Sequence, residues 1–585
     1  MSFRWIFNQT EDEEAVSELQ RQLGVSPTIA RLLAIRGINS YSDAESFFRP
    51  NKDNLHDPFL MTDMEQAAQR LADAIRTQQK VVVYGDYDVD GTTATSIMYT
   101  FMSDFGVDVY YYIPHRFKEG YGISEEGINY ACNLGADLIV AVDCGITAVE
   151  EAEQCRENGL DLIICDHHNT DLNVPRACAV LDPKRPDCNY PFDGLSGAGV
   201  AYKLIEATLI KLGLPKDSAY RFLDLVAISI ASDIVPIVNE NRILMREGLI
   251  KLNSDPNLGI KALTDLIQLK TSEIDTTNIV FSIGPRINAA GRMGDAAKAV
   301  ELLITDSLHE AEAHAHELEA INIRRRSTDS ETMKQAIRTL EQDFNEEKMS
   351  SVVLHDPDWH LGVIGIVASR IVDLYCRPTI MLSTVDGQIK GSARSVKGFN
   401  VYDALSECGD LLEQFGGHEY AAGVTLNKEN LEPFIERFND IANRYLAEND
   451  FKQELLIDDE LELKQIDQKF WNVLRQFEPY GPGNMKPVFF SRNLSVQGNP
   501  TVVGNGHLKM RLYQPGSPTF EAIGFNLHDY LPAVRNCPAG SLHVAYVLEE
   551  NTWNNRTQIQ MRIKDIKTDA NELPDYKNEN LIAKN

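Results

Sequence analysis

Three features that would point to common classes of protein are missing from this 585-residue sequence. It has no apolar run of about 18 residues, which is the length that a membrane-spanning helix needs, so we expect no membrane association. Its nine cysteines are scattered without a CxxC pair, and neither a zinc site nor a disulfide framework is indicated. The first residues, MSFRW, lead into acidic residues and not into an apolar signal core, which predicts a cytoplasmic protein.

A surplus of basic residues is missing as well. The chain carries 56 Lys and Arg against 86 Asp and Glu, which gives a formal net charge of −30. This balance disfavours the broad basic surface that is typical of proteins that bind duplex DNA. A groove needs only local arginines and lysines together with bound cations. The composition therefore predicts, at most, a narrow basic track.

The most informative stretch is VVVYGDYDVDGTTAT, residues 81–95. Apolar residues end in three aspartates at alternate positions, and a glycine with small hydroxyl residues follows, which predicts a strand, a loop and the start of a helix. If the loop is extended, Asp86, Asp88 and Asp90 project to one side, where their repulsion favours a divalent cation. The alternative is an acidic turn in which an aspartate only caps the helix.

Three further apolar segments end in acids or histidines in the same way. They are residues 137–143, which end at Asp143, residues 161–168, which end at Asp166-His167-His168, and residues 225–233, which end at Asp233. Continuous apolar runs separated by helical stretches predict buried strands of a parallel sheet, whose carboxyl ends share one edge. Oxygen and imidazole ligands gathered at that edge suit Mn²⁺ or Mg²⁺.

Candidates for contact with a phosphate lie in glycine-bearing segments. These segments are PHRFKEGYG at 114–122, GPRINAAGR at 284–292, GSARS at 391–395 and GGHEYAAG at 416–423. Arginine offers a bidentate fork to phosphate, and glycine allows the backbone to approach closely. The predicted substrate-binding residues are Arg116, Arg286, Ser392, Arg394, Gly416, Gly417 and His418. Alternatively, residues 114–122 form an ordinary surface loop.

The arrangement of strand-like, helix-like and turn-forming segments along the chain predicts an α/β protein of several domains. We expect an N-terminal helical cap at 1–63, a parallel-sheet α/β domain at 64–304, a long connecting helix at 305–350, a smaller α/β domain at 351–454, a β-barrel like an OB-fold at 455–570 and a flexible tail at 571–585. Arg324-Arg325-Arg326 in the connecting helix could face either solvent or a groove. The barrel would offer a surface for single strands, or else a module for packing or protein contact.

These motifs resemble those of the DHH phosphoesterase family. Asp166-His167-His168, the loop at 86–90, Asp143 and Asp233 resemble the family's catalytic set, and residues 416–423 resemble the signature of its companion domain, DHHA1. The resemblance covers about the whole chain. It is greatest to the members of the family that act as exonucleases specific for single-stranded DNA.

The resemblance implies a metal-dependent 5′–3′ exonuclease that hydrolyses phosphodiester bonds by a two-metal mechanism in recombination and repair. It implies that Asp143 bridges both ions and that His168 faces the scissile phosphate, while Asp166 orients His167. The remaining implied ligands are Asp86, Asp88, Asp90, His167 and Asp233. One departure is Tyr84, which stands where relatives with smaller substrates often carry a histidine ligand.

The implied partners are single-stranded DNA, a single-strand-binding protein and a helicase, and we expect a monomer. An alternative is a phosphodiesterase of the same family that acts on short oligonucleotides or cyclic dinucleotides. Such an enzyme would share the catalytic set without needing the N-terminal cap or the barrel. A non-catalytic scaffold with this fold would have lost several ligands, and all of them are present.

Overall fold

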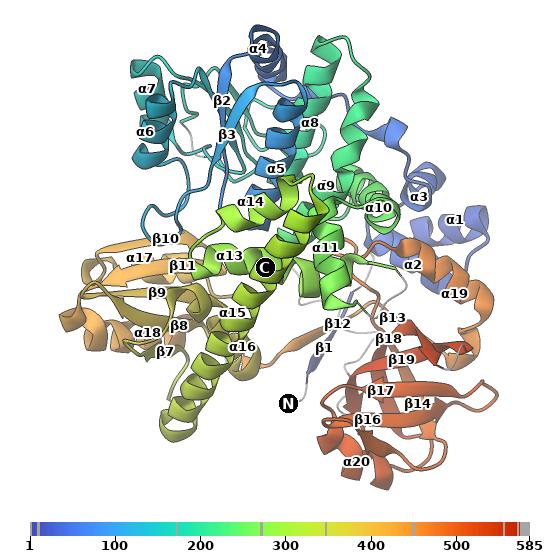
Figure 1. Cartoon of the computed structure of the whole chain (residues 1–585). Helices are drawn as coiled ribbons and strands as arrows, with labels where there is room; N and C mark the ends of the chain where they lie inside the picture. The colour runs from blue at the N-terminus through green and yellow to red at the C-terminus, as the bar shows by residue number, and fades with distance from the viewer. Residues whose placement is uncertain are drawn as a thin grey trace. The chain divides into compact units, whose positions relative to one another are not determined.

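A computed structural model describes residues 3–8, 12–170, 173–269, 273–345, 348–446, 451–553, 556–569 and 573 (Figure 1). It divides into a larger unit, residues 50–446 with 481–483, and a smaller unit, residues 1–49, 447–480 and 484–585. The predicted tail at 571–585 lies outside the described residues, apart from residue 573. Every helix within the described ranges is too short or too polar to span a bilayer.

The larger unit is built around a five-stranded parallel sheet in the order β3-β2-β4-β5-β6. The strands are β2 (Lys80–Tyr84), β3 (Asp108–Tyr112), β4 (Leu138–Val142), β5 (Asp161–Cys165) and β6 (Ala179–Leu181). Helices α4 (Met64–Thr77), α5 (Val89–Asp104) and α8 (Gly197–Lys211) cover one face, and α6 (Glu125–Leu134) and α7 (Val149–Glu157) cover the other (Figure 1).

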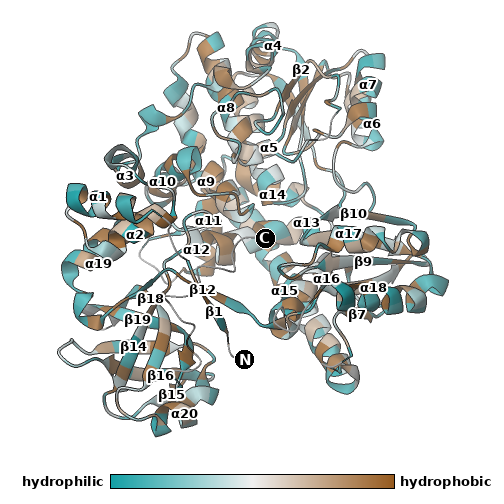
Figure 2. Cartoon of the chain, turned by 180° about the vertical axis from the view of Figure 1, so that it is seen from behind, coloured by the Kyte–Doolittle hydropathy of each residue, from teal (hydrophilic) through white to brown (hydrophobic). Residues whose placement is uncertain are grey.

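Burial on both faces explains the continuous apolar runs of β2, β4 and β5. Val81 and Val83 pack with α4, α5 and α8, whereas Val82 and Tyr84 pack with α6 and α7. No position in the middle of such a strand faces water, so the sequence shows no alternation of polar and apolar residues. The strands beside β2 are mostly brown in Figure 2. The predicted parallel sheet is confirmed.

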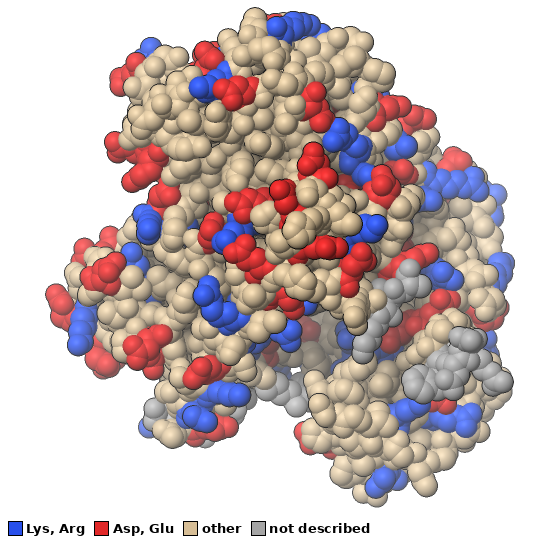
Figure 3. All heavy atoms as spheres, viewed as in Figure 1, with Lys and Arg blue, Asp and Glu red and all other residues tan. Residues whose placement is uncertain are grey.

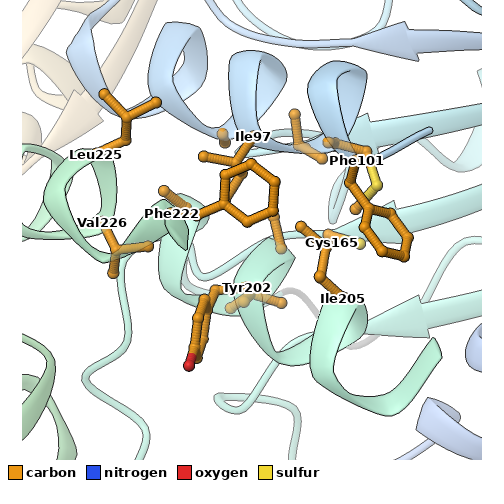
Figure 4. Packing of buried hydrophobic residues seen from close by; sticks show 14 of the residues in the cluster. Ile97, Phe101, Cys165, Tyr202, Ile205, Phe222, Leu225 and Val226 are labelled. Carbon is orange, nitrogen blue, oxygen red and sulfur yellow. The ribbon is translucent and has the colours of Figure 1, made fainter. Parts of the chain in front are cut away.

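The prediction that residues 225–233 form a fourth strand is wrong. This segment forms the helix α9 (Leu223–Ser232), in which every residue from Leu223 to Ala231 is buried. Figure 4 shows Phe222, Leu225 and Val226 in the same core as side chains of α5, α8 and β5. A helix that is apolar on all sides produces the same continuous run as a buried strand, so periodicity cannot separate the two.

Helices complete the larger unit's first domain and connect it to the second. They are α10 (Asn239–Ser254), α11 (Leu258–Ile267), α12 (Thr276–Asn278), a π-helical turn at Ile279–Ile283, α13 (Gly284–Met293), α14 (Ala297–Ile304) and α15 (Leu308–Asp343). The 36 residues of α15 form the predicted long connecting helix. Of its three consecutive arginines, Arg325 is buried and Arg324 and Arg326 are exposed.

The second domain of this unit has a mixed sheet in the order β10-β11-β9-β8-β7. Its elements are β7 (Val352–His355), α16 (Leu361–Tyr375), β8 (Thr379–Val385), β9 (Gln388–Arg394), α17 (Val401–Ser406), β10 (Gln414–His418), β11 (Ala421–Leu426) and α18 (Leu431–Tyr445). Only the β7–β8 pair in this sheet is parallel.

The smaller unit contains a closed β-barrel. Strand β14 (Phe489–Val496) pairs with both β18 (Leu542–Trp553) and β16 (His507–Tyr513), and β19 (Arg556–Lys567) and β17 (Phe520–Gly524) complete the ring. The other elements of this part are β12 (Glu454–Ile457), β13 (Asp459–Glu460), α19 (Gln468–Leu474), β15 (Thr501–Val503) and α20 (Leu531–Asn536). A ring of five strands fits the predicted OB-like barrel.

The N-terminal segment belongs to the barrel unit and does not form a separate cap. Strand β1 (Arg4–Phe7) pairs in parallel with β12, and α1 (Glu13–Leu23), α2 (Pro27–Ile35) and α3 (Tyr41–Phe48) follow it. Leu32 of α2 lies in the same apolar cluster as Phe489 of the barrel. The chain therefore leaves the smaller unit at residue 49 and returns to it at residue 447.

Candidate functional site

The predicted metal ligands lie at the carboxyl edge of the parallel sheet. Asp143 directly follows β4, and Asp166, His167 and His168 directly follow β5. Asp86 lies between β2 and α5. Asp233 reaches the same place as the C-terminal cap residue of α9. The segment before Asp233 is a helix and not the predicted strand, but the Asp233 side chain still lies at the carboxyl edge of the sheet with the other ligands.

Two groups of ligand atoms form at this edge. Asp86, Asp88 and Asp143 offer atoms within 4.8 Å of one another, as do Asp90, His167 and Asp233. Asp143 and His167 also form a third such group with His168, which joins the first two. His167 Nε2 lies 3.1 Å from Asp143 Oδ1, 3.5 Å from Asp90 Oδ2 and 3.6 Å from Asp233 Oδ2. The geometry suits two adjacent cations.

The three aspartates of the first motif contribute to two different groups of ligand atoms. Helix α5 begins at Val89, so Asp88 is its N-cap and accepts a hydrogen bond from the Gly91 backbone N–H at 3.1 Å. Asp90 lies inside the first turn, where its carboxylate accepts hydrogen bonds from the backbone N–H groups of Gly197 and Ala198 and from Ser229 Oγ. Asp88 is thus both a cap and a candidate ligand, because its second oxygen is not used by the cap.

The burial and charge of these groups fit divalent cations. Asp86 Oδ1, Asp143 Oδ1 and both ring nitrogens of His167 are buried without a hydrogen-bond partner among the described residues. Burial, together with neighbouring carboxylates, raises the pKa of Asp86 and Asp143 well above the usual range. Burial and the charge of Asp90 likewise raise the pKa of Asp233 to about 8. Buried carboxylates that repel one another need a compensating positive charge.

The backbone around Asp143 is specialised for its position. Asp143 has a φ of 62°, in the left-handed region that residues other than glycine rarely adopt. A β-carbon added to Gly197 would lie 2.5 Å from Asp143 Oδ1. Glycine therefore lets the start of α8 approach the carboxylate closely, and a larger residue there would displace it.

Asp166 orients His168 and not His167, contrary to the prediction. Its Oδ1 lies 2.7 Å from His168 Nδ1, and its carboxylate accepts hydrogen bonds from the backbone N–H groups of His167 and Ile146. The turn after β5 folds the second histidine back over the carboxylate, while the ring of His167 points to the other acids. Burial lowers the pKa of His168, but the hydrogen bond with Asp166 outweighs it and raises the pKa to about 9.

Sequence reasoning missed Tyr121 as a neighbour of His168. The Tyr121 hydroxyl lies 2.9 Å from His168 Nδ1 and donates to the Asp143 backbone carbonyl at 3.1 Å. It belongs to the loop that also carries Arg116, the segment at 114–122. The aromatic residue at the end of that segment was the available signal.

Three arginines from different elements gather beside the metal centre. Arg116 lies in the loop after β3, Arg292 in α13 and Arg394 in β9. Burial lowers the pKa of Arg292 to about 10 and also lowers the pKa of Arg394, and in both cases the charge of Arg116 adds to the effect. Among the described residues none of the three forms an ion pair. We call these residues the arginine cluster; like charges held together without counter-ions indicate a site for an anion.

Local contacts fix the members of the arginine cluster. Arg394 Nη1 donates to Ser392 Oγ at 2.9 Å, and the Arg116 guanidinium lies 4.8 Å from the centroid of the Tyr87 ring. A β-carbon on Gly362, at the start of α16, would lie 2.0 Å from the Arg292 carbonyl oxygen, so the two domains of the larger unit meet closely here. Ser392 and Arg394 lie in the strand β9.

Arg286, the arginine chosen from the segment at 284–292, does not reach the cluster. The segment is the helix α13 and not a loop. Arg286 Nε donates to Glu319 at 2.6 Å and Nη1 donates to the Ser282 carbonyl at 2.7 Å, so its charge is already neutralised. Arg292 takes the predicted place. Gly291, immediately before it, was a usable signal, since a β-carbon there would lie 2.2 Å from the Tyr87 carbonyl oxygen.

Gly417 and His418 line a hollow of about 610 Å³ in the larger unit, and Gly416 lies beside them on β10 without lining it. The other lining residues are Asn169, Asn400, Tyr402, Glu419, Tyr420 and Ala421. Ala421 pairs in register with both His418 and Arg394 across the sheet. The motif at 416–423 thus forms a hairpin whose tip is one strand away from the arginine cluster.

Charge on the surface is mixed. Acidic and basic side chains lie side by side on the face shown in Figure 3, and no broad basic field crosses it. This agrees with the net charge of −30 and leaves the half-buried arginine cluster as the concentrated positive site described above.

Models of known families match three parts of the chain. Residues 80–230 match the N-terminal domain of the DHH family, residues 347–444 match the DHHA1 domain and residues 457–565 match the RecJ OB domain. These matches fall on the parallel sheet, on the mixed sheet and on the barrel.

Whole proteins match along nearly the full length. The single-stranded-DNA-specific exonuclease RecJ of Bacillus subtilis is 37% identical over 96% of this chain and 70% of its own. A crystal structure of RecJ from Thermus thermophilus in complex with Mn²⁺ matches with a TM-score of 0.82 and 30% identity over 96% of this chain and 79% of that chain. A crystal structure of the same relative in complex with Mg²⁺ matches with a TM-score of 0.76 and 29% identity, and covers 96% and 78% of the two chains. The sheet edge carries groups of acids and histidines, and the DHH, DHHA1 and RecJ OB models match successive parts of the chain. Together with the similarity along the whole chain, these findings show that the protein belongs to the RecJ family.

Proposed function

We propose that this protein is a metal-dependent exonuclease that hydrolyses single-stranded DNA from its 5′ end, in recombination and repair. The observation that carries the proposal is the arginine cluster beside two groups of buried acids and histidine. Two Mn²⁺ or Mg²⁺ ions bound there would neutralise the phosphodiester, lower the pKa of a water molecule and support the leaving oxygen.

We assign the ligand atoms from the two groups. Asp86 and Asp88 would hold one cation, Asp90, His167 and Asp233 the other, and Asp143 both, because it belongs to the first group and lies 3.1 Å from the ligand nitrogen of the second. His168, kept protonated by Asp166, would donate a hydrogen bond to the scissile phosphate. This contact would strengthen as negative charge develops on the phosphate oxygens.

The arginine cluster explains why the enzyme would work from an end. A terminal phosphate carries more negative charge than an internal phosphodiester and has three free oxygens to receive donors. Arg116, Arg292 and Arg394, with Ser392, would bind it and hold the first linkage over the metal centre. Gly416, Gly417 and His418 would line the path of the first nucleotides. Arg286 is left out of this assignment because Glu319 neutralises it.

The remaining expectations complete the proposal. We assign residues 64–304 to catalysis, 351–454 to substrate binding and 455–570 to holding the strand, with 305–350 as the connector. The barrel would grip long strands by stacking bases on aromatic side chains. We also propose that the protein acts in the cytoplasm as a monomer, with a helicase and a single-strand-binding protein supplying the strand.

Arg394→Ala tests the terminal-phosphate site. Each charge-assisted hydrogen bond contributes about 1.5–3 kcal/mol, so the variant should lose about tenfold or more in kcat/KM on a 5′-phosphorylated oligonucleotide. The loss on the matching 5′-hydroxyl oligonucleotide should be smaller. Arg437→Ala is the matched control, because this arginine of the same domain pairs with Asp410 at the surface. Equal losses on both substrates would assign Arg394 to general contact with the backbone.

A phosphodiesterase acting on dinucleotides is the second candidate, since it would use the same metal centre. A long oligonucleotide and a dinucleotide should be offered as competing substrates in one reaction with Mn²⁺. Preference for the long strand supports the exonuclease, and preference for the dinucleotide supports the alternative.

A further inference from the structure

A second hollow opens at the far edge of the parallel sheet. Its volume is about 750 Å³, within the range of pockets that hold small ligands. Its lining includes Asn169 and Thr170, which follow His168, Pro183, Lys184 and Arg185, which follow β6, and one carboxylate, Asp193. Asn169 also lines the hollow beside His418, so the two hollows meet at the residue next to the catalytic histidines.

The two cations in this hollow differ in their partners. Arg185 is buried and pairs with Asp63 at 2.7 Å and Asp187 at 2.7 Å, which makes it part of the framework. Lys184 is half-buried, and no carboxylate of the described residues lies within ion-pair distance of its ammonium. Its backbone N–H donates to Asp182 Oδ1 at 2.7 Å, which fixes the turn that carries it. An unpaired ammonium in a hollow is available to an anionic ligand.

Lys184 also lies close enough to the metal centre to influence its residues. Burial and Asp90 raise the pKa of Asp233, and the charge of Lys184 is among the opposing effects that lower it. The same charge adds to the lowering of the His167 pKa, whose largest cause is burial. The ammonium of Lys184 is therefore within electrostatic range of the ligand group formed by Asp90, His167 and Asp233.

The strand order places Lys184 opposite the arginine cluster. Arg116 follows β3 at one edge of the sheet, Lys184 follows β6 at the other edge, and Asp143 follows β4 in the middle. Neighbouring strands lie about 4.8 Å apart, so each edge is roughly 10 Å from the middle strand. A nucleic acid strand laid along this rim would meet the arginine cluster, then the metal centre, then Lys184.

We propose that Lys184 binds the phosphate that follows the scissile bond on its 3′ side, and that the hollow holds the nucleotide between them. This inference rests on the proposed function and specifies the direction of the strand across the site. With its terminal phosphate on the arginine cluster and its downstream phosphate on Lys184, the substrate would be held on both sides of the metal centre. A substrate with only one linkage would lack the second anchor.

The test compares a 5′-phosphorylated dinucleotide with a 5′-phosphorylated trinucleotide, because only the trinucleotide has the downstream phosphate. Lys184→Ala should lower the ratio of kcat/KM on the trinucleotide to that on the dinucleotide about tenfold. Lys184→Arg should restore most of this ratio, because it keeps the charge. An unchanged ratio for Lys184→Ala would overturn the proposal.

A trinucleotide whose second linkage is an uncharged methylphosphonate locates the contact. For the wild-type protein this substitution should cause the same loss as Lys184→Ala, and for Lys184→Ala it should cause no further loss, since the two changes remove one interaction. Independent, additive losses would place Lys184 away from that phosphate. Lys211→Ala serves as the control, because this lysine pairs with Glu65 and does not line the hollow.

Binding without turnover separates this inference from the proposed function. Affinity for the two trinucleotides is measured in EDTA, where no cleavage takes place. If the wild-type protein cleaves neither substrate with Mn²⁺, the exonuclease proposal fails, yet a preference for the charged trinucleotide that disappears in Lys184→Ala still supports the phosphate site. Equal affinity of the wild-type protein for both trinucleotides would refute it.

Discussion

Arg286 and Arg292 lie on the same helix, α13, but only Arg292 belongs to the arginine cluster. Glu319 of α15 neutralises Arg286, whereas Arg292 is surrounded by the charges of Arg116, Arg394 and Arg325. Because the charge of Arg292 has no carboxylate partner among the described residues, it is the one available to a phosphate.

This difference predicts different effects for Arg292→Ala and Arg286→Ala. Arg292→Ala should reduce the preference for 5′-phosphorylated over 5′-hydroxyl oligonucleotides about tenfold, since it removes one charge-assisted hydrogen bond to the terminal phosphate. Arg286→Ala should keep the preference and lower the thermal stability instead, because Glu319 loses its partner. Both quantities are measured on both variants. If Arg286→Ala changes the preference and Arg292→Ala does not, our assignment of the cluster is wrong.

Asp143→Asn should abolish most of the activity without unfolding the protein. Losing the carboxylate that belongs to two ligand groups should lower kcat at least ~10³-fold, or about 4 kcal/mol. Mn²⁺ should raise the melting temperature of the wild-type protein and raise that of the variant much less, because the ion binds the folded state. Asp108→Asn is the control, because Asp108 is the first residue of β3 and lies at the amino end of the strands, away from the ligands. A variant with a tenth of the wild-type rate would exclude a role for Asp143 in binding both ions.

Lys203 should be critical for stability although it is not one of the proposed metal ligands or phosphate-binding residues. Its ammonium is fully buried and lies 2.5 Å from Glu240 and 3.1 Å from Glu206. Lys203→Met leaves two buried carboxylates without their cation and should cost about 3–5 kcal/mol in the free energy of unfolding. Lys211→Met, on the same helix, breaks a partly exposed pair with Glu65 and should cost less than about 1 kcal/mol. Urea denaturation compares the two variants, and similar losses would contradict this reasoning.

Asp182 should make the metal-free protein less stable as the pH rises. Burial raises its pKa to about 7, against the opposing effects of the Lys184 backbone N–H and ammonium and of His168, while Asp166 adds to the rise. A carboxyl group with a raised pKa in the folded state stabilises the fold at low pH, and this contribution is lost as the pH rises toward 7. Between about pH 5.5 and 7 the loss should be about 2 kcal/mol.

Asp182→Asn removes the titrating group and should flatten this part of the stability profile. The comparison uses urea denaturation of both proteins in EDTA, so that metal binding does not contribute. Parallel profiles for the two proteins would show that Asp182 does not titrate in this range.

A chain of residues 50–446 should fold and cleave very short substrates, because it contains all the proposed ligands and the arginine cluster. It should bind long oligonucleotides more weakly, since it lacks the stacking of bases on the barrel, which contributes ~1–3 kcal/mol per base. The slope of log affinity against log salt should fall by ~0.7 for each phosphate that the barrel would otherwise bind. Unchanged affinity for long strands would favour protein contact as the role of the barrel.

The sequence was sufficient wherever a local pattern determined the structure. Strand β4 is apolar throughout, β2 and β5 are apolar after their first residue, and acids or histidines follow all three, so both the sheet and its reactive edge could be predicted. Helix α9 could not be separated from a strand, because burial on all sides removes the helical period. Strand β6 has only three residues, so Asp182 and Lys184 after it gave no comparable signal.

Long-range packing decided the rest of the site. Apart from Gly291, nothing in the segment at 284–292 distinguishes Arg286 from Arg292, because the distinction depends on Glu319 and on a strand more than a hundred positions away. The ring that Asp166 orients depends likewise on how the turn after β5 folds, which residue types alone do not specify.

The pairing of β1 with β12 has a consequence for the order of events during synthesis. In the sequence, residues 50–446 of the larger unit separate residues 1–49 from the rest of the smaller unit, so residues 1–49 leave the ribosome long before the strand and barrel with which they pack. The larger unit can fold while the first helices still lack their partners, and those helices carry apolar faces that include Ile29, Leu32 and Leu33. During that interval we expect the apolar faces of the N-terminal segment to be exposed to solvent.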